Sequence, residues 1–390
     1  MGLYRFLLAA SVVVAHSSKL PGISLLDAGL AVKTFFMISG FYMQLILDSK
    51  YSRVENGIRL FYTNRALRIY PMYLLAFAFA VLFYLAASVK LHHPVDRLAY
   101  WVDAARLHLY GPLALIGVSQ FTVIGLDLTP LFYYVRNVGF HLITTHNFPP
   151  NSTLAWRFNF MPHCWSIGAE LFFYSLMPLF NYCRTRLLIP LCFVAAASVA
   201  LNTWIAPVLS GPMNYHFGPM QLFYFLLGIL SYRIVYKKVL LGKSRGDWRL
   251  FIPIAVVAVC TFSPWWGDAN SSGSPHNLLT GCYLIVAATS VPLLFHVTRT
   301  IRWDRWIGEL SYPMYLLHIP LKWVLLAKQG VSQKDEATVS GVSLLILTVV
   351  AAFLMTYFVD RPVEAFRQRR YERKAGDSPT AAHPQPLVKS

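Results

Sequence analysis

Ionisable side chains inside long apolar segments are the first residues whose types and spacing indicate chemistry. Arg5 and His16 lie in one such segment, eleven residues apart. At 100° per residue this spacing places both side chains on one helical face, about 16 Å apart along the axis. Ionisable groups in lipid are costly and mark a candidate functional site. A snorkelling arginine and a hydrogen-bonded interfacial histidine are the alternative interpretation.

A carboxylate and a second histidine occupy later apolar segments. Glu170 lies about two turns into a segment that begins near Trp165, and His318 lies in a segment close to the carboxyl end. A carboxylate at that depth must be neutral or paired. We expect both side chains at a depth similar to that of His16. The three residues together predict a site.

Two arginines stand at the entrance of another apolar segment. Arg65 and Arg68 are three residues apart and therefore share a helical face. Such a pair is suited to bind a phosphate, because each guanidinium matches two phosphate oxygens. An ordinary cytoplasmic anchor is the alternative. In the segment before them, Gly29, Ser39 and Gly40 allow a close approach between helices.

The composition shows which elements must position these residues. The chain has 390 residues, of which 56% are hydrophobic and only 13% charged, with a formal net charge of +17. Soluble domains carry about 25% charged residues, and the aromatic content excludes a disordered chain. A nucleic-acid-binding protein would not have such long uncharged runs. The five cysteines show no CxxC spacing, so we expect no metal site.

The hydropathy pattern predicts an all-α polytopic membrane protein with about ten transmembrane helices. A helix needs about 20 apolar residues to cross. The predicted spans are 3–20, 25–47, 69–89, 164–182, 187–209, 219–236, 250–266, 278–297, 307–327 and 339–359. An eleventh apolar stretch, 109–126, is interrupted by glycine and proline, and we expect it to be re-entrant or to lie on the outer surface.

Basic residues set the expected orientation. They concentrate in the segments 48–68, 183–186, 237–249, 298–306 and 361–374. Positive residues favour the cytoplasmic side, and all five segments share one side only if 90–163 lies on the other. We therefore expect both termini in the cytoplasm. Residues 1–374 would form one transmembrane domain and 375–390 a disordered cytoplasmic tail. A signal peptide is an alternative for the first span, although that segment is poor in positive charge.

Five motifs in order resemble the membrane-bound acyltransferase family 3, the bacterial glycan O-acyltransferases. The first two are Arg5-x10-His16 and a Phe-Phe-x-x-Ser39-Gly-Phe motif that follows Gly29. The other three are Arg65-x-x-Arg68-Ile-x-Pro-x-Tyr, Trp165-Ser-x-x-x-Glu170-x-x-Phe-Tyr and Ser-Tyr312-x-x-Tyr-Leu-x-His318-x-Pro. The chain departs from the family at the start of the first motif, where Leu3-Tyr4-Arg5 replaces Leu-Asp-Gly-Leu-Arg. We expect no appended esterase-like domain of the kind that some members carry.

The resemblance implies transfer of an acyl group, usually acetyl from acetyl-CoA, to a hydroxyl of a cell-surface or lipid-linked glycan. It implies a location in the bacterial cytoplasmic membrane. Residues expected to bind the donor are Arg5, Arg65, Arg68 and Ser39, and those expected to bind the acceptor are Trp165 and Tyr312. The cytoplasmic position expected for the three arginines suits a polyanionic donor. The expected partners are the donor, the acceptor and membrane lipid, without nucleic acid.

Our mechanistic hypothesis is direct transfer with His16 as general base. Glu170 or His318 would orient the imidazole or polarise the thioester carbonyl. An acyl-histidine intermediate is the variant. A proton-coupled transporter would also place histidine and glutamate within a basic-faced bundle, although it usually shows an internal repeat. A scaffold subunit of a polysaccharide assembly would need no buried ionisable residues.

Overall fold

The computed structural model describes residues 1–144, 148–205, 207–240, 278–328 and 339–376. The chain divides into two compact units. The first unit combines Met1–Met72, Met177–Ile189 and Tyr224–Ser390, and the second combines Tyr73–Leu176 and Pro190–Phe223. Four helices continue from one unit into the other, namely α3 (Gly57–Leu91), α6 (Trp165–Tyr182), α7 (Thr185–Ile205) and α9 (Gly218–Leu230).

The first unit consists of helices from both ends of the chain. Its further elements are α1 (Gly2–Ala15), α2 (Ala28–Ser49), the short 3₁₀ turn η1 (Tyr51–Arg53), the π-helical η5 (Ser231–Leu240), α12 (Leu278–Thr298), α13 (Arg302–Glu309), α14 (Ser311–Lys328), α15 (Gly341–Met355), η9 (Thr356–Asp360) and α16 (Arg361–Gly376). Side-chain caps begin two of the helices, because the carboxylate of Asp27 accepts the Leu30 N–H at 3.0 Å and Ser340 accepts the Ser343 N–H.

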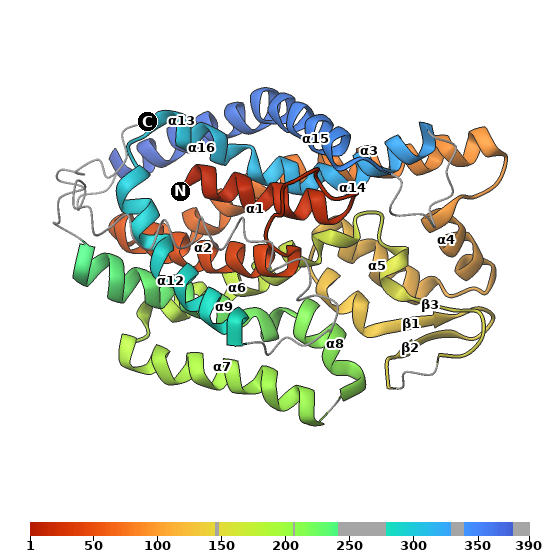
Figure 1. The fold of residues 1–390 in the computed structure, drawn as a ribbon, viewed down its shortest axis with the longest axis horizontal. Coiled ribbons are helices and arrows are strands. Elements are labelled where there is room, and N and C mark those ends of the chain that lie inside the picture. Colours follow the sequence, from red (N-terminus) through yellow and green to blue (C-terminus); the bar gives the residue numbers. More distant parts are fainter. Residues whose placement is uncertain (145–147, 206, 241–277, 329–338, 377–390) are drawn as a thin grey trace. The chain divides into compact units, whose positions relative to one another are not determined.

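Helix α1 is the centre of packing in this unit. It contacts α2, α13, α14 and α15, and α14 packs extensively on α15 (Figure 1). Glycine permits the closest approaches, as a Cβ on Gly40 of α2 would lie 2.1 Å from the Phe225 carbonyl oxygen of α9. A Cβ on Gly228 would lie 2.0 Å from the Met37 carbonyl oxygen. The small residues of the second apolar segment therefore have the close-packing role that their size predicts.

The second unit contains a small antiparallel sheet that the hydropathy pattern did not predict. Its order is β2 (Gly139–Leu142), β1 (Phe132–Val135) and β3 (Ser152–Leu154). A three-residue turn joins β1 to β2, with Val135 opposite Gly139 and Asn137 at a φ of 67°. Asparagine is one of the few residues that adopt this left-handed conformation readily. The other elements of this unit are α4 (Asp96–Arg106), α5 (Tyr110–Thr122), the 3₁₀ turns η2 (Leu126–Leu131), η3 (Ala155–Phe158) and η4 (Pro162–Cys164), and α8 (Pro207–His216).

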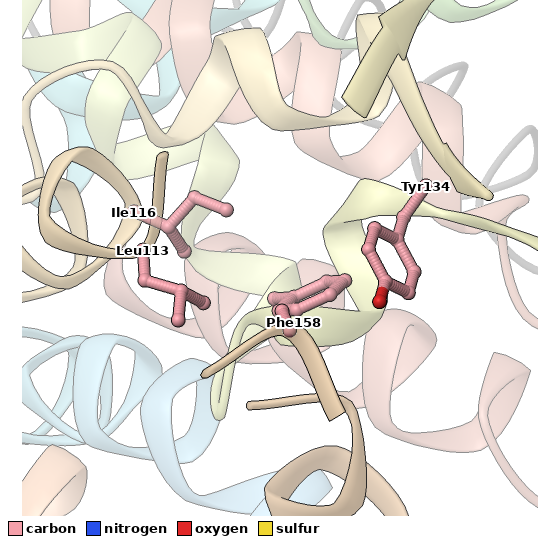
Figure 2. Packing of buried hydrophobic residues seen from close by; sticks show 5 residues of the cluster. Leu113, Ile116, Tyr134 and Phe158 are labelled. Carbon is pink, nitrogen blue, oxygen red and sulfur yellow. The ribbon is translucent and has the colours of Figure 1, made fainter. Parts of the chain in front are cut away.

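A hydrophobic cluster holds the sheet against α4 and α5. Leu113 and Ile116 of α5 pack with Tyr134 of β1 and Phe158 of η3, and Phe158 is fully buried (Figure 2). Burial raises the pKa of the Tyr134 hydroxyl to about 12, and its hydrogen bond to the Asp103 carboxylate acts in the same direction. A tyrosine that stays protonated can donate to this carboxylate at any physiological pH.

The helices confirm an all-α membrane fold but not the predicted number of ten spans. Within the described residues, six helical stretches are long and apolar enough to cross a membrane. They are Ala28–Ser49, Gly57–Leu91, Thr185–Asn202, Gly211–Leu240, Thr280–Thr298 and Gly341–Lys374. Helix α1 has only 14 residues. The predicted span 250–266 and residues 377–390 of the predicted tail lie outside the described residues. Helix α5 has 13 residues and is about 20 Å long, short of the ~30 Å apolar layer.

Candidate functional site

Two histidines predicted from separate segments lie next to each other in the first unit. His16 directly follows α1, and His318 lies in the middle of α14, which packs on α1. Their ring centroids are 5.0 Å apart, and the ring planes are inclined by 59°. His16 is half-buried, whereas His318 has no exposed surface. The structure therefore brings together two of the three predicted catalytic residues.

Backbone carbonyl groups determine the proton position on both rings. Nδ1 of His16 is 2.8 Å from the Val12 carbonyl oxygen, and Nδ1 of His318 is 2.7 Å from the Tyr315 carbonyl oxygen. A carbonyl oxygen only accepts hydrogen bonds, so Nδ1 must carry the proton in each ring. The neutral rings consequently have their lone pair on Nε2. Both imidazoles are thus in the tautomer in which Nε2 can accept a proton.

The opposite end of α1 carries Arg5 and is attached to α13. The carboxylate of Asp304 accepts the backbone N–H groups of Gly2 and Leu3, each at 2.8 Å. Gly2 also lies against the backbone of α13, where a Cβ would collide with the Asp304 carbonyl oxygen. The carboxylate therefore satisfies two N–H groups that the start of a helix leaves unpaired. This attachment sets the position of the helix that carries Arg5 and leads to His16.

The predicted arginines gather in the first unit. The charges of Arg5, Arg68 and Arg305 all influence the Tyr42 hydroxyl of α2, as does the carboxylate of Asp304, so these side chains belong to one neighbourhood. Arg68 also attracts the Glu309 carboxylate at the end of α13. We call the neighbourhood of Tyr42 that contains Arg5, Arg68 and Arg305 the positive region. It brings the arginine of the first motif close to one member of the arginine pair.

Tyr312 and Ser39 also lie in the first unit. The Tyr312 hydroxyl donates a hydrogen bond of 3.1 Å to the Ile69 carbonyl oxygen, one residue beyond Arg68. This bond connects α14, which carries His318, to α3, which carries the arginine pair. Ser39 is half-buried in α2, next to the close-packed Gly40. The role of both residues toward a substrate remains a prediction.

Glu170 and Trp165 lie in the second unit, on α6. The Glu170 carboxylate accepts a hydrogen bond from the Tyr174 hydroxyl one turn further along the helix. This bond partly meets the requirement that a carboxylate at this depth be paired. The centroid of the Trp165 ring lies 5.1 Å from that of Tyr215 and 4.9 Å from that of His216. Both partners are at the end of α8. The proposed roles of Glu170 and Trp165 in catalysis and acceptor binding remain predictions.

The structure connects two further charged residues to these groups, Asp304 and Arg367, which no sequence motif indicated. Asp304 lies in a short amphipathic segment, and no pattern in the sequence relates it to α1. Arg367 belongs to the basic segment 361–374, in which we counted every cation as a signal of orientation. It is only 6% exposed, unlike its exposed neighbour Arg369. The i,i+3 spacing of Glu364 and Arg367 is the one sequence feature that could have indicated its pairing.

Comparison with known protein families gives a match along nearly the whole chain. The family described as an acyltransferase domain, Acyl_transf_3, matches residues 2–358. No curated protein and no solved structure matches the chain. The matched range includes the histidine pair, the arginines of the positive region, Glu170 and Trp165. This chain therefore belongs to acyltransferase family 3 and is a membrane acyltransferase.

Proposed function

We propose that the protein transfers an acyl group, most simply acetyl, from acyl-CoA to a hydroxyl of a cell-surface or lipid-linked glycan. The observation that carries this proposal is the histidine pair, in which each ring has a free lone pair on its own Nε2. The pair lies at one end of α1, and Arg5 lies at the other end. A proton acceptor and an anion-binding region are the two groups that a thioester donor and a hydroxyl acceptor require.

His16 is the better general base of the two histidines. It is half-buried, so an acceptor hydroxyl can approach its ring, whereas His318 is enclosed. Nε2 of His16 takes the hydroxyl proton while the hydroxyl oxygen attacks the thioester carbonyl carbon. The C–S bond then breaks, the ester is released, and the imidazolium returns the proton to the CoA thiolate. His318, at 5.0 Å, supports the position and charge of this ring.

The donor would bind in the positive region. CoA carries several phosphate charges. The charges of Arg5 and Arg68 both influence Tyr42 of α2, so the two arginines are close enough to bind one polyanion. The length of α1 separates this region from the histidine pair by about 16 Å, which an extended pantetheine arm can span. This arrangement supports donor entry from the side of the basic segments and acceptor entry from the other side.

The proposal predicts that His16→Ala loses activity by about 100-fold or more, the usual contribution of a general base. The measurement is transfer of radiolabelled acetyl from acetyl-CoA to envelope glycan in membranes that contain equal amounts of each variant. His93→Ala is a matched control, because His93 is exposed and lies in the second unit. Full activity of His16→Ala would contradict the mechanism. A normal KM for acetyl-CoA in Arg68→Ala would contradict donor binding by the arginine pair.

A further inference from the structure

Arg367 of α16 is a buried cation that the proposed reaction has not yet used. Its side chain is 6% exposed, and Nη1 donates to the Glu364 carboxylate. Its Nε is buried and has no hydrogen-bond partner among the described residues. Burial of a cation costs several kcal/mol unless its N–H groups are paired. The half-exposed Glu364 carboxylate therefore offsets only part of the cost of burying the Arg367 guanidinium.

The neighbours of Arg367 make the position more positive. The positive charges of Arg65 and Arg68 of α3 repel the charge of Arg367, and the charge of Arg65 also repels that of Lys50. Nε of Arg65 is also buried and lacks a partner in the part of the chain that the structure describes. Two arginines with buried N–H groups that lack partners among the described residues, close to further cations, have the donors and the charge that bind a polyanion.

Helix α16 is held firmly in this position. The Lys50 ammonium lies 3.9 Å from the centroid of the Tyr371 ring, and the Tyr371 hydroxyl donates to the Lys50 carbonyl oxygen at 3.4 Å. Nζ of Lys50 also donates to the Gln368 side chain at 3.4 Å. The ring centroids of Tyr371 and Tyr51 are 6.1 Å apart, and the Tyr51 hydroxyl accepts a hydrogen bond of 2.9 Å from Asn64, the residue before Arg65. The part of α16 that carries Arg367 and the turn of α3 that carries Arg65 are therefore joined through Tyr51.

We propose that Arg367 binds a phosphate group of the acyl-CoA donor together with Arg65. This inference rests on the proposed function and adds to it a third arginine, from the carboxyl end of the chain. Guanidinium groups bind phosphate through two parallel N–H bonds, so the unpaired Nε atoms and the adjacent amino groups of both residues suit this ligand. A phosphate would also relieve the repulsion among the cations.

The test compares donors with and without phosphate. In purified full-length protein, Arg367→Gln is expected to raise the KM for acetyl-CoA roughly tenfold, as loss of a charged hydrogen bond predicts. The KM for acetyl-pantetheine, which has no phosphate, is expected to stay the same. Arg367→Lys keeps the charge but loses the paired geometry, so its KM for acetyl-CoA should be intermediate. Arg369→Gln on the exposed face of α16 is the matched control.

Each outcome decides between distinct conclusions. Equal effects of Arg367→Gln on both donors, or no effect on either, would overturn the inference. If wild type transfers acetyl from neither donor, the proposed function fails, and calorimetric titration with CoA then tests Arg367 alone. Equal CoA affinity of wild type and Arg367→Gln would overturn the inference there. In nanodiscs of phosphatidylcholine alone, weaker CoA binding by Arg367→Gln supports a donor phosphate as the ligand. An effect of the variant that appears only when phosphatidylglycerol is added would identify a lipid headgroup as the ligand and overturn the inference.

Discussion

Asp304 shows how one side chain outside the histidine pair determines where the arginine of α1 lies. Burial by itself would raise the pKa of this carboxyl. Hydrogen bonds from the Leu3 N–H, the Met1 amino group and the Gly2 N–H outweigh burial and lower the pKa below its usual value. The ionised form is therefore the one that the folded protein stabilises. Its contribution to folding is fully present above the unfolded pKa and is lost as pH falls through the folded pKa.

We predict that Asp304→Asn destabilises the protein by about 1–3 kcal/mol at pH 7, because a neutral amide accepts the same N–H groups more weakly. Thermal unfolding of the purified protein in detergent measures the difference. It should begin to shrink below about pH 4, the ordinary pKa of an aspartate in the unfolded chain, and disappear as the folded carboxyl takes up a proton at lower pH. Glu55→Gln is the control, because Glu55 is exposed and a surface substitution of this kind changes stability by less than about 0.5 kcal/mol. A difference independent of pH would contradict this account of Asp304.

At the scale of elements, glycine allows α2 and α9 to approach within backbone contact. We predict that Gly40→Ala destabilises the protein by roughly 1–3 kcal/mol, because the new Cβ would lie 2.1 Å from the Phe225 carbonyl oxygen and must push the helices apart. The matched control is Gly281→Ala in α12, where a Cβ meets nothing within 4 Å. That change should stabilise the helix by up to about 1 kcal/mol. The measurement is the unfolding temperature of each variant. A shift in the same direction for both variants would contradict the close-packing role of Gly40.

Hydropathy and spacing predicted the elements of the site better than their contacts. Histidines at similar depth in α1 and α14 do lie together, because membrane depth is encoded in the length of an apolar run. The small sheet was missed, since strands of three or four residues leave little periodicity. The contact between Asp304 and α1 joins residues about 300 positions apart, and no local pattern encodes it. The sequence predicts an anchor at Arg367, because it cannot distinguish this residue from the other cations of segment 361–374. Only the packing of α16 shows that Arg367 is buried.

At the scale of the whole molecule, the net charge of +17 has two parts with different physical roles. Most cations lie in segments between the apolar helices, where they orient the chain in the membrane. A smaller set is half-buried or buried in the first unit and includes Arg65, Arg68 and Arg367. The charges of its members repel one another or influence the Tyr42 hydroxyl. The mechanism requires this set to face the compartment that contains acyl-CoA. The orientation of the chain is therefore a condition of the proposed chemistry.

Cysteine labelling in intact cells tests this orientation. We predict that a membrane-impermeant maleimide labels Asn137→Cys, in the exposed turn between β1 and β2, but not Glu55→Cys or Glu372→Cys, which are also exposed. The background carries serine at positions 183, 260 and 282, and permeabilised cells show that every introduced thiol can react. Labelling of Glu55→Cys from outside would place the arginines of the first unit away from cytoplasmic acyl-CoA. Donor binding at Arg65, Arg68 and Arg367 would then be impossible, whatever the geometry of the histidine pair.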